Sequence, residues 1–279
     1  MNTMKAWLLM GGLTVLLVML GRVLFGPSGA MMFFVIAMAL NFFSYFYSDK
    51  IAIKMTKSYP VTQAEAPELY EMIGRLSRRA GIPMPKLYVT PSAQPNAFAT
   101  GRNPANAAVA VTEGIMRLLT RTEVEGVLAH ELAHIKNRDV LVGTIAAALA
   151  GAITMMANAF QWAAIFGMGR DDEGGGGLIG GLIMAFLAPL AAMVIQMAIS
   201  RSREYSADAT GAQIAGSSEG LANALLKLES AAQRIPMQTN PATSHLFIVN
   251  PLSGKTMARL FSTHPPIQER VEKLRSMRV

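Results

Sequence analysis

The sequence contains no cysteine among its 279 residues and only four histidines. Disulfide bonds and thiolate metal ligands are therefore excluded, while the redox compartment stays undecided. A zinc site in this chain would have to be built from histidine and carboxylate side chains. The placement of the four histidines therefore decides whether such a site can exist.

Charged residues are also scarce, at 15% of the chain, against about 25% in an average soluble domain. A sizeable share of the chain is therefore expected to lie outside water. The net charge of +7 would fit a nucleic-acid-binding protein, but the basic residues cluster beside apolar runs, as they do in membrane proteins. We expect a lipid bilayer, and no nucleic acid, as a partner.

Long apolar runs occur as two pairs. The first pair covers about residues 6–25 and 30–47, and the second covers about residues 140–168 and 178–199. Each run is near the ~20 residues that a helix needs to cross a bilayer. The runs predict four transmembrane helices arranged as two hairpins. A glycine run, residues 174–177, lies between the two runs of the second pair. It lacks the Gly-Lys-Ser/Thr continuation of a phosphate-binding loop, so it is not expected to bind phosphate.

The remaining residues predict a soluble α+β unit that is divided by the second hairpin. Residues 66–81 have helical spacing and end at a glycine, and short strands are expected around 85–91, 96–101 and 106–112. The expected fold is a mainly α membrane protein with four transmembrane helices and a small β-sheet in its cytoplasmic unit. The expected boundaries are 1–48 for the first hairpin, 49–139 for the first part of the soluble unit, 140–199 for the second hairpin and 200–279 for the second part.

The sidedness of this arrangement follows from Lys and Arg. If four spans are counted, Lys5, the block Lys50–Arg79 and Arg201–Arg203 fall on one side of the membrane. The other side receives only Arg22 and Arg170. Because cytoplasmic loops carry the excess of Lys and Arg, both termini and the soluble unit are expected in the cytoplasm.

Two of the four histidines stand in an H-E-x-x-H pattern, formed by His130, Glu131 and His134. Residues four apart on a helix fall about 40° apart on one face, so both imidazoles can point at one ion. Glu131 lies close enough to take a proton from a ligand of that ion. Thr122, with Glu125 three residues later, is the predicted N-cap of this helix. The alternative is an ordinary amphipathic helix with two surface histidines.

A third ligand is needed, and the segment 200–212 offers Glu204 and Asp208 on one helical face. Glu204 can complete the metal site, and Asp208 can accept a hydrogen bond from the far nitrogen of a ligand histidine. The alternative is a solvated helix in which these carboxylates form surface ion pairs with neighbouring arginines.

The motifs HELAHIKNRD, SRSREYSADATGA and STHPPIQER, in this order, resemble the HtpX family of membrane zinc endopeptidases, relatives of the type I CAAX prenyl protease. The resemblance covers essentially the full chain. It implies one Zn²⁺ held by His130, His134 and Glu204, with Glu131 as general base and Asp208 as a supporting carboxylate. It also implies a structural role for the acidic position that Asp139 matches.

The same resemblance gives meaning to the last motif and to an edge strand. His264 would bind the tetrahedral oxyanion, with Arg270 near it, although His264 could instead cap the chain before two prolines. NAFATG resembles a strand edge that binds an extended substrate through its main chain, which points to Asn96, Ala97 and Phe98. Asn96 could equally cap a turn, and His245 receives no role.

The sequence thus predicts a zinc metalloendopeptidase of the bacterial cytoplasmic (inner) membrane, multi-pass and with its active site on the cytoplasmic side. Misfolded or damaged membrane proteins would be its substrates, in quality control and the stress response, and a homo-oligomer is left open. Two alternatives remain: a non-catalytic, zinc-stabilised membrane scaffold, and a protease that cleaves inside the membrane. Charged residues on both sides of the H-E-x-x-H pattern argue against the second.

Overall fold

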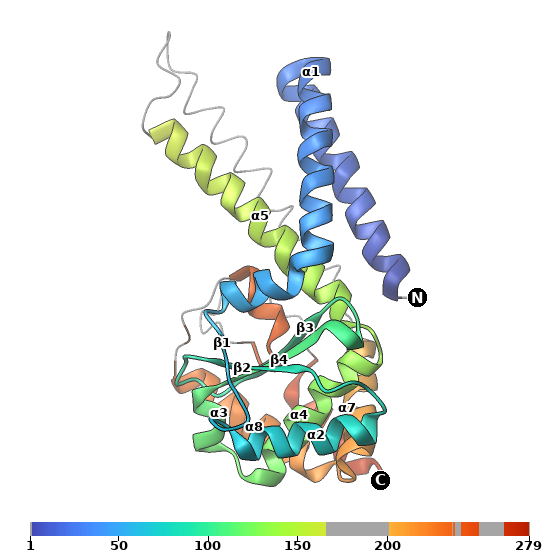
Figure 1. Cartoon of the computed structure of the whole chain (residues 1–279), viewed down its shortest axis with the longest axis vertical. Helices are drawn as coiled ribbons and strands as arrows, with labels where there is room; N and C mark the ends of the chain where they lie inside the picture. Colours follow the sequence, from blue (N-terminus) through green and yellow to red (C-terminus); the bar gives the residue numbers. More distant parts are fainter. Residues whose placement is uncertain (1, 166–200, 236, 238–240, 251–264, 279) are drawn as a thin grey trace.

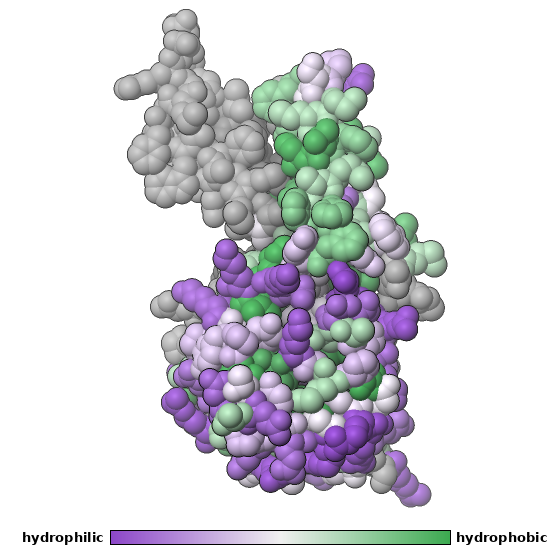
Figure 2. All heavy atoms as spheres, in the orientation of Figure 1, coloured by the Kyte–Doolittle hydropathy of each residue, from purple (hydrophilic) through white to green (hydrophobic). Residues whose placement is uncertain are grey.

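The computed structural model describes residues 2–165, 201–235, 237, 241–250 and 265–278. Within these ranges the chain forms a compact domain of helices and one sheet, from which long apolar helices rise (Figure 1). Hydrophobic residues dominate the surface of the rising helix α1, whereas hydrophilic residues dominate the surface of the compact domain (Figure 2). This division agrees with a mainly helical membrane protein that carries a soluble unit.

Helix α1 (Asn2–Met55) is a hairpin of two helical arms. The arms meet at Gly26, whose φ of 69° lies in the left-handed region that glycine adopts without a Cβ clash. The second arm, Phe25–Met55, is long and apolar enough to cross a membrane, and Ala6–Arg22 is a shorter apolar helix. The first predicted hairpin is therefore present as a pair of helices. Its second arm continues beyond the expected boundary at residue 48.

Helix α5 (Val140–Ile165) is the third apolar helix and packs against the α1 hairpin. Their shared contact includes Leu13, Leu17 and Phe33 from α1 and Ile145 and Leu149 from α5. By length and composition, one helix of the described residues qualifies as a membrane span. The predicted fourth span, 178–199, lies outside the described residues, so the count of four spans stays a prediction.

The sheet has the strand order β1-β2-β4-β3, formed by β1 (Tyr59–Pro60), β2 (Lys86–Thr90), β4 (Ala107–Thr112) and β3 (Ala97–Gly101). Strands β2 and β4 are parallel, whereas β3 runs antiparallel to β4 and forms an edge of the sheet. The three strands expected from the sequence are thus confirmed within a residue or two. The sequence reading missed β1, because two residues give no periodic signal.

Helices cover the face of the sheet that is turned away from α1 (Figure 1). Ala97, Ala99, Val109 and Val111 of β3 and β4 point into this main core, whereas Phe98 points to the opposite face. Such alternation is what the period of two in a strand produces. The helices of the compact domain are α2 (Pro67–Ala80), α3 (Glu113–Leu118), α4 (Arg121–Lys136), α7 (Arg201–Ala215), α8 (Glu219–Arg234) and α10 (Ile267–Ser276), with short 3-10 turns η1 (Pro104–Asn106) and η2 (Pro241–Leu246).

Candidate active site

Helix α4 carries the H-E-x-x-H residues and begins at a complete capping box. The hydroxyl of Thr120 accepts from the backbone N–H of Glu123, and the carboxylate of Glu123 accepts from the N–H of Thr120. The predicted cap, Thr122 with Glu125, is therefore wrong by two residues. Both pairs satisfy the same spacing rule, but only Thr120 has the extended backbone that an N-cap requires. Glu125 instead pairs with Arg75 on α2.

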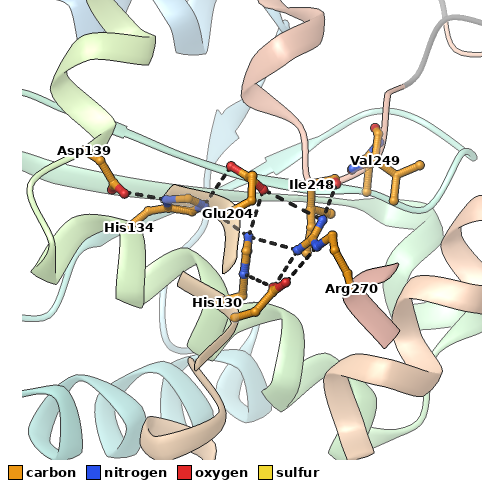
Figure 3. Close-up of polar contacts among 9 residues, drawn as sticks. His130, His134, Asp139, Glu204, Ile248, Val249 and Arg270 are labelled. Carbon is orange, nitrogen blue, oxygen red and sulfur yellow. Dashed lines mark hydrogen bonds and ion pairs between the residues drawn. The ribbon is translucent and has the colours of Figure 1, made fainter. Parts of the chain in front are cut away.

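His130, His134 and Glu204 come together where α4 meets the first turn of α7 (Figure 3). The two Nε2 atoms are 3.1 Å apart, and the carboxylate oxygens of Glu204 lie 3.8 Å from Nε2 of His130 and 3.6 Å from Nε2 of His134. One donor atom from each residue lies within 4.8 Å of the other two. The three predicted ligands thus face one point, although 70 positions separate His134 from Glu204 in the sequence.

Each imidazole is oriented through its other nitrogen by a carboxylate. Nδ1 of His130 lies 2.9 Å from Oδ1 of Asp208, and Nδ1 of His134 lies 3.1 Å from Oδ1 of Asp139 (Figure 3). A proton held between Nδ1 and a carboxylate leaves Nε2 free to act as a ligand. Each histidine therefore has an aspartate within hydrogen-bonding distance of its Nδ1. From the sequence, both aspartates are expected to support the ligands, but a hydrogen bond to a ligand histidine is predicted for Asp208 alone.

Arg270, from α10, is completely buried and holds Asp208 with two hydrogen bonds of 2.9 Å and 2.7 Å. The third guanidinium nitrogen, Nη1, lies 3.8 Å from a carboxylate oxygen of Glu204. The guanidinium outweighs the effect of burial and lowers the pKa of Asp208 to about 2, so the aspartate stays ionised at neutral pH. Arg270 thereby connects α10 to the ligand cluster, and its position beside the site agrees with the sequence-based expectation.

Gly211 allows the close approach of α7 to α4 that brings Glu204 to the histidines. A Cβ at this position would lie 2.9 Å from Cα of His130 and 3.0 Å from its backbone nitrogen. Real side chains do not approach backbone atoms so closely, so any larger residue would push the helices apart. The ligand geometry consequently depends on a residue that makes no contact with a metal.

Comparison with known proteins agrees with this geometry. The model of peptidase family M48 matches residues 63–278. The chain belongs to peptidase family M48. It is 67% identical to a protease HtpX homolog of Pelotomaculum thermopropionicum over the full length of both proteins, and 55% identical to that of Desulfatibacillum aliphaticivorans, covering 99% of this chain and 90% of the relative. This M48 chain is therefore a membrane-associated metalloprotease.

A solved structure shares the fold. The crystal structure of S. mikatae Ste24p superposes with a TM-score of 0.53 at 19% identity, covering 95% of this chain and 62% of Ste24p. At that identity the likeness concerns the fold alone.

The donor set of this M48 site fits a metal ion. In a tetrahedral zinc site the ligand atoms lie about 2.0–2.1 Å from the metal, which separates them from each other by roughly 3.3 Å. The Nε2 atoms of His130 and His134, at 3.1 Å, match that separation. If the Nδ1–H group of each imidazole is directed at an aspartate, both Nε2 atoms are unprotonated. Without a cation between them, their lone pairs would repel each other. A shared cation, metal or proton, resolves that repulsion.

Glu131 is almost completely buried beside this cluster without belonging to it. Burial raises the pKa of its carboxyl to about 7. The charge of Glu204 raises this pKa further, whereas His134 and a backbone hydrogen bond from Ala99 on β3 lower it. A carboxyl that titrates near neutral pH can both accept and return a proton under working conditions. Its hydrogen bond from Ala99 also places it beside β3, the strand at the edge of the sheet.

The three residues predicted to contact substrate are covered by the chain itself. The amide of Asn96 donates to the carbonyl of Val249 at 2.7 Å, and the carbonyl of Ala97 accepts from the N–H of Ile248 at 3.0 Å. The ring of Phe98 packs edge-on against Phe247, with centroids 5.1 Å apart. Asn96 therefore neither faces solvent nor caps a turn with its side chain, because its amide is used to hold residues 247–249 on the edge of β3.

Of the remaining two histidines, His245 lies within the described residues and His264 does not. Nε2 of His245 lies 3.0 Å from the carbonyl oxygen of Gly143, so it joins η2 to the base of α5. No sequence signal pointed to this contact, because it depends on two distant segments meeting. His264 lies outside the described residues, and its oxyanion-binding role stays a prediction.

Proposed function

We propose that this M48 protein is a zinc-dependent endopeptidase of the bacterial cytoplasmic membrane that cleaves misfolded or damaged membrane proteins. The observation that carries the proposal is the meeting of His130, His134 and Glu204 at one point, with Glu131 beside it. A structural metal site has no use for the buried glutamate, which argues against a non-catalytic scaffold.

Zinc is proposed because the donors are two imidazoles and one carboxylate. This set is typical of catalytic zinc sites, in which three protein ligands leave one coordination position open. When bound, zinc would supply Lewis acidity for the scissile carbonyl and lower the pKa of the attacking water. The chain's own residues provide ligand orientation through Asp139 and Asp208, and the proton transfer.

Glu131 would take the proton of the attacking water and pass it to the leaving amine. Its pKa of about 7 supports both directions of transfer near neutral pH. Arg270 would act through Asp208, keeping that carboxylate ionised and directed at His130. We assign the oxyanion to His264, on the resemblance of its motif to the HtpX family.

An extended substrate would pair with the edge of β3 that faces away from β4, near Ala99 and Glu131. Main-chain pairing gives affinity with little dependence on sequence, which suits unfolded polypeptides of many kinds. Because residues 247–249 hold the neighbouring positions Asn96 and Ala97, a substrate that uses those positions must displace them.

The location is proposed from the distribution of charge and from the fold. Helices α1 and α5 rise from the same side of the peptidase domain, and the Lys/Arg excess lies with the domain rather than with the hairpin turn (Figure 1). The protein would accordingly cross the membrane several times, with its active site and both termini in the cytoplasm. Helix α4 packs within the compact domain, which argues against cleavage inside the bilayer.

The decisive experiment replaces Glu131 by Gln in the full-length protein. Zinc content should stay near one per chain, because Glu131 is not among the ligands, whereas cleavage of an unfolded membrane substrate should fall at least about 100-fold. Metal analysis and cleavage rates are measured on the same preparation. Unchanged cleavage would exclude Glu131 as the general base.

The matched control is Glu125→Gln, on the same helix. Glu125 pairs with Arg75 and Arg121 at the surface of the domain and has no part in the ligand cluster. Its replacement should leave both zinc content and cleavage near the wild-type values. A loss as large as that of Glu131→Gln would point to damage to α4 rather than to lost proton transfer.

A further inference from the structure

A pocket with a volume of ≈ 340 Å³ lies where the second arm of α1 enters the compact domain. This volume falls within the range of about 300–1,000 Å³ that is typical of small-ligand pockets. Its lining combines Phe46, Tyr47 and Lys50 of α1 with Lys86 and Arg102 of the domain. Aromatic and cationic side chains thus meet at a place that has no part in the peptidase site.

The topology of the sheet gathers the two domain cations at one end. Lys86 is the first residue of β2. It pairs with Ala108, near the start of the parallel strand β4. Strand β3 runs the opposite way, so its end at Gly101, followed by Arg102, joins the same end of the sheet. One cation is therefore the first residue of a strand, and the other directly follows the end of a strand.

The three cations have no carboxylate partner among the described residues. No salt bridge there involves Lys50, Lys86 or Arg102, and Asp49 is the one acidic side chain in the pocket lining. The lining therefore carries a net charge of +2. Arg102 lies over the ring of Phe46 at 5.5 Å, and Lys50 over the ring of Tyr47 at 5.3 Å, which positions both charges beside the aromatic surface.

The pocket also lies at the depth of a bilayer surface, given that the second arm of α1 crosses the membrane. The arm rises from Gly26, and about 20 helical residues cover the ~30 Å of a hydrocarbon core, which ends near Phe46. Trp7 stacks on Tyr45 across the hairpin at this level, with centroids 5.8 Å apart. Tryptophan and tyrosine concentrate at membrane interfaces. Exposed Phe42 and Phe43 would lie beside lipid chains.

We propose that this pocket binds the phosphate headgroup of an anionic glycerophospholipid, with the acyl chains lying along Phe42 and Phe46. Basic pockets beside membrane helices recognise such headgroups, because the phosphate is neutralised while the chains stay in the bilayer. The occupant is a lipid rather than free phosphate, since the pocket offers aromatic surface next to its cations. This inference rests on the proposed membrane insertion of α1 and not on proteolysis.

The test uses the full-length protein in detergent, titrated with phosphatidylglycerol or with phosphatidylcholine of the same acyl chains, and native mass spectrometry to count bound lipids. Phosphatidylglycerol should bind at least roughly tenfold more tightly, since its net negative charge is attracted by the Lys and Arg side chains of the pocket, whereas phosphatidylcholine carries no net charge. Lys50→Gln/Lys86→Gln should abolish that preference, and Arg102→Gln should weaken it. Millimolar inorganic phosphate should not displace the lipid.

The charge-matched control is Arg78→Gln/Arg278→Gln, which removes two exposed cations, one on α2 and one at the C-terminus, at the end of the domain opposite α1 (Figure 1). It should keep the lipid preference. Equal binding of both lipids by the wild type, a preference that survives in Lys50→Gln/Lys86→Gln, or displacement by free phosphate would overturn the proposal. Substrate cleavage, measured on the same samples, separates the two hypotheses: a lipid preference without cleavage would count against the proposed function alone.

Discussion

At the scale of single residues, protons compete with metal at the ligand cluster. Burial alone would lower the pKa of His134, but Asp139, then Glu204 and Glu131, raise it to about 10 in the metal-free protein. Burial instead dominates for His130, whose pKa is lowered. The two histidines together therefore carry one extra proton near neutral pH, and this proton is on the imidazole of His134. Metal must displace that proton in order to bind.

We predict that the apparent affinity for zinc rises with pH, by about tenfold per unit between pH 6.5 and 8.5, because one proton is released per metal. The sign follows from the raised pKa of His134: below about 10 the ring is protonated, and each lower unit of pH strengthens the competing proton. Competition with a chelator of known affinity measures this slope. A slope near zero would contradict the proton count.

Asp139→Asn provides the comparison for this slope. The amide no longer favours the charged imidazole, so the pH dependence should become shallower than in the wild type. At pH 8.5, affinity should still fall by roughly 10- to 100-fold, because the ring of His134 loses the carboxylate that orients it. A variant that matches the wild type in both respects would leave Asp139 without a role at the site.

At the scale of elements, the position of α7 on α4 decides whether Glu204 reaches the histidines. We predict that Gly211→Ala destabilises the protein by about 1–3 kcal/mol, the usual cost of an added methyl group in a packed interface. Zinc content should fall as well, because the methyl group would meet the backbone of His130. Denaturant unfolding and metal analysis check the two effects.

Gly74→Ala, on α2, is the matched control. A Cβ there would find its nearest neighbour, a nitrogen of Arg78, at 3.7 Å, which is an ordinary contact. Alanine also favours a helix over glycine, so stability should hold or rise. If both substitutions had the same effect, the close approach at Gly211 would not be the cause.

The clasp between β3 and residues 247–249 gives a second prediction at this scale. Asn96→Ala removes the donor to Val249 and the acceptor for Ala97, which should cost about 1–3 kcal/mol for the buried partners left behind. Hydrogen exchange at Ile248 should accelerate, whereas exchange within β4 should stay slow. Unaltered exchange at Ile248 would show that Asn96 does not hold this segment.

These elements also show how far sequence reasoning reaches. The end of α2 at Gly81 and the three strands were predictable, because turn residues and alternation are local signals. The start of α4 was misplaced, since Thr120 and Thr122 offer the same local spacing. The clasp by Asn96 was beyond prediction, because residues 96 and 249 meet only once the whole chain has folded.

At the scale of the whole molecule, the metal site is assembled from α4 and α7, which the largely apolar segment 140–199 separates in the sequence. Helix α5 begins at Val140, directly after the Asp139 that orients His134, and Glu204 lies within the described part of α7, Arg201–Ala215. The sequence predicted that the ends of the third and fourth spans would adjoin the site. The start of the third apolar helix does adjoin the site, whereas the end of the predicted fourth span lies among residues 166–200, outside the described chain, so that half of the expectation stays a prediction. What the sequence lacked was the shared role of Asp139, which only the fold reveals.

The absence of cysteine makes the proposed sidedness directly testable, because one introduced thiol is the only reactive one. Ser28→Cys places it in the exposed turn between the arms of α1, and Glu272→Cys places it on exposed α10 of the compact domain. If the peptidase domain faces the cytoplasm, a membrane-impermeant maleimide added to spheroplasts should label Ser28→Cys at once. Glu272→Cys should be labelled only after lysis. The reverse pattern would place the active site outside the cytoplasm, and labelling of both would mean that α1 does not cross the bilayer.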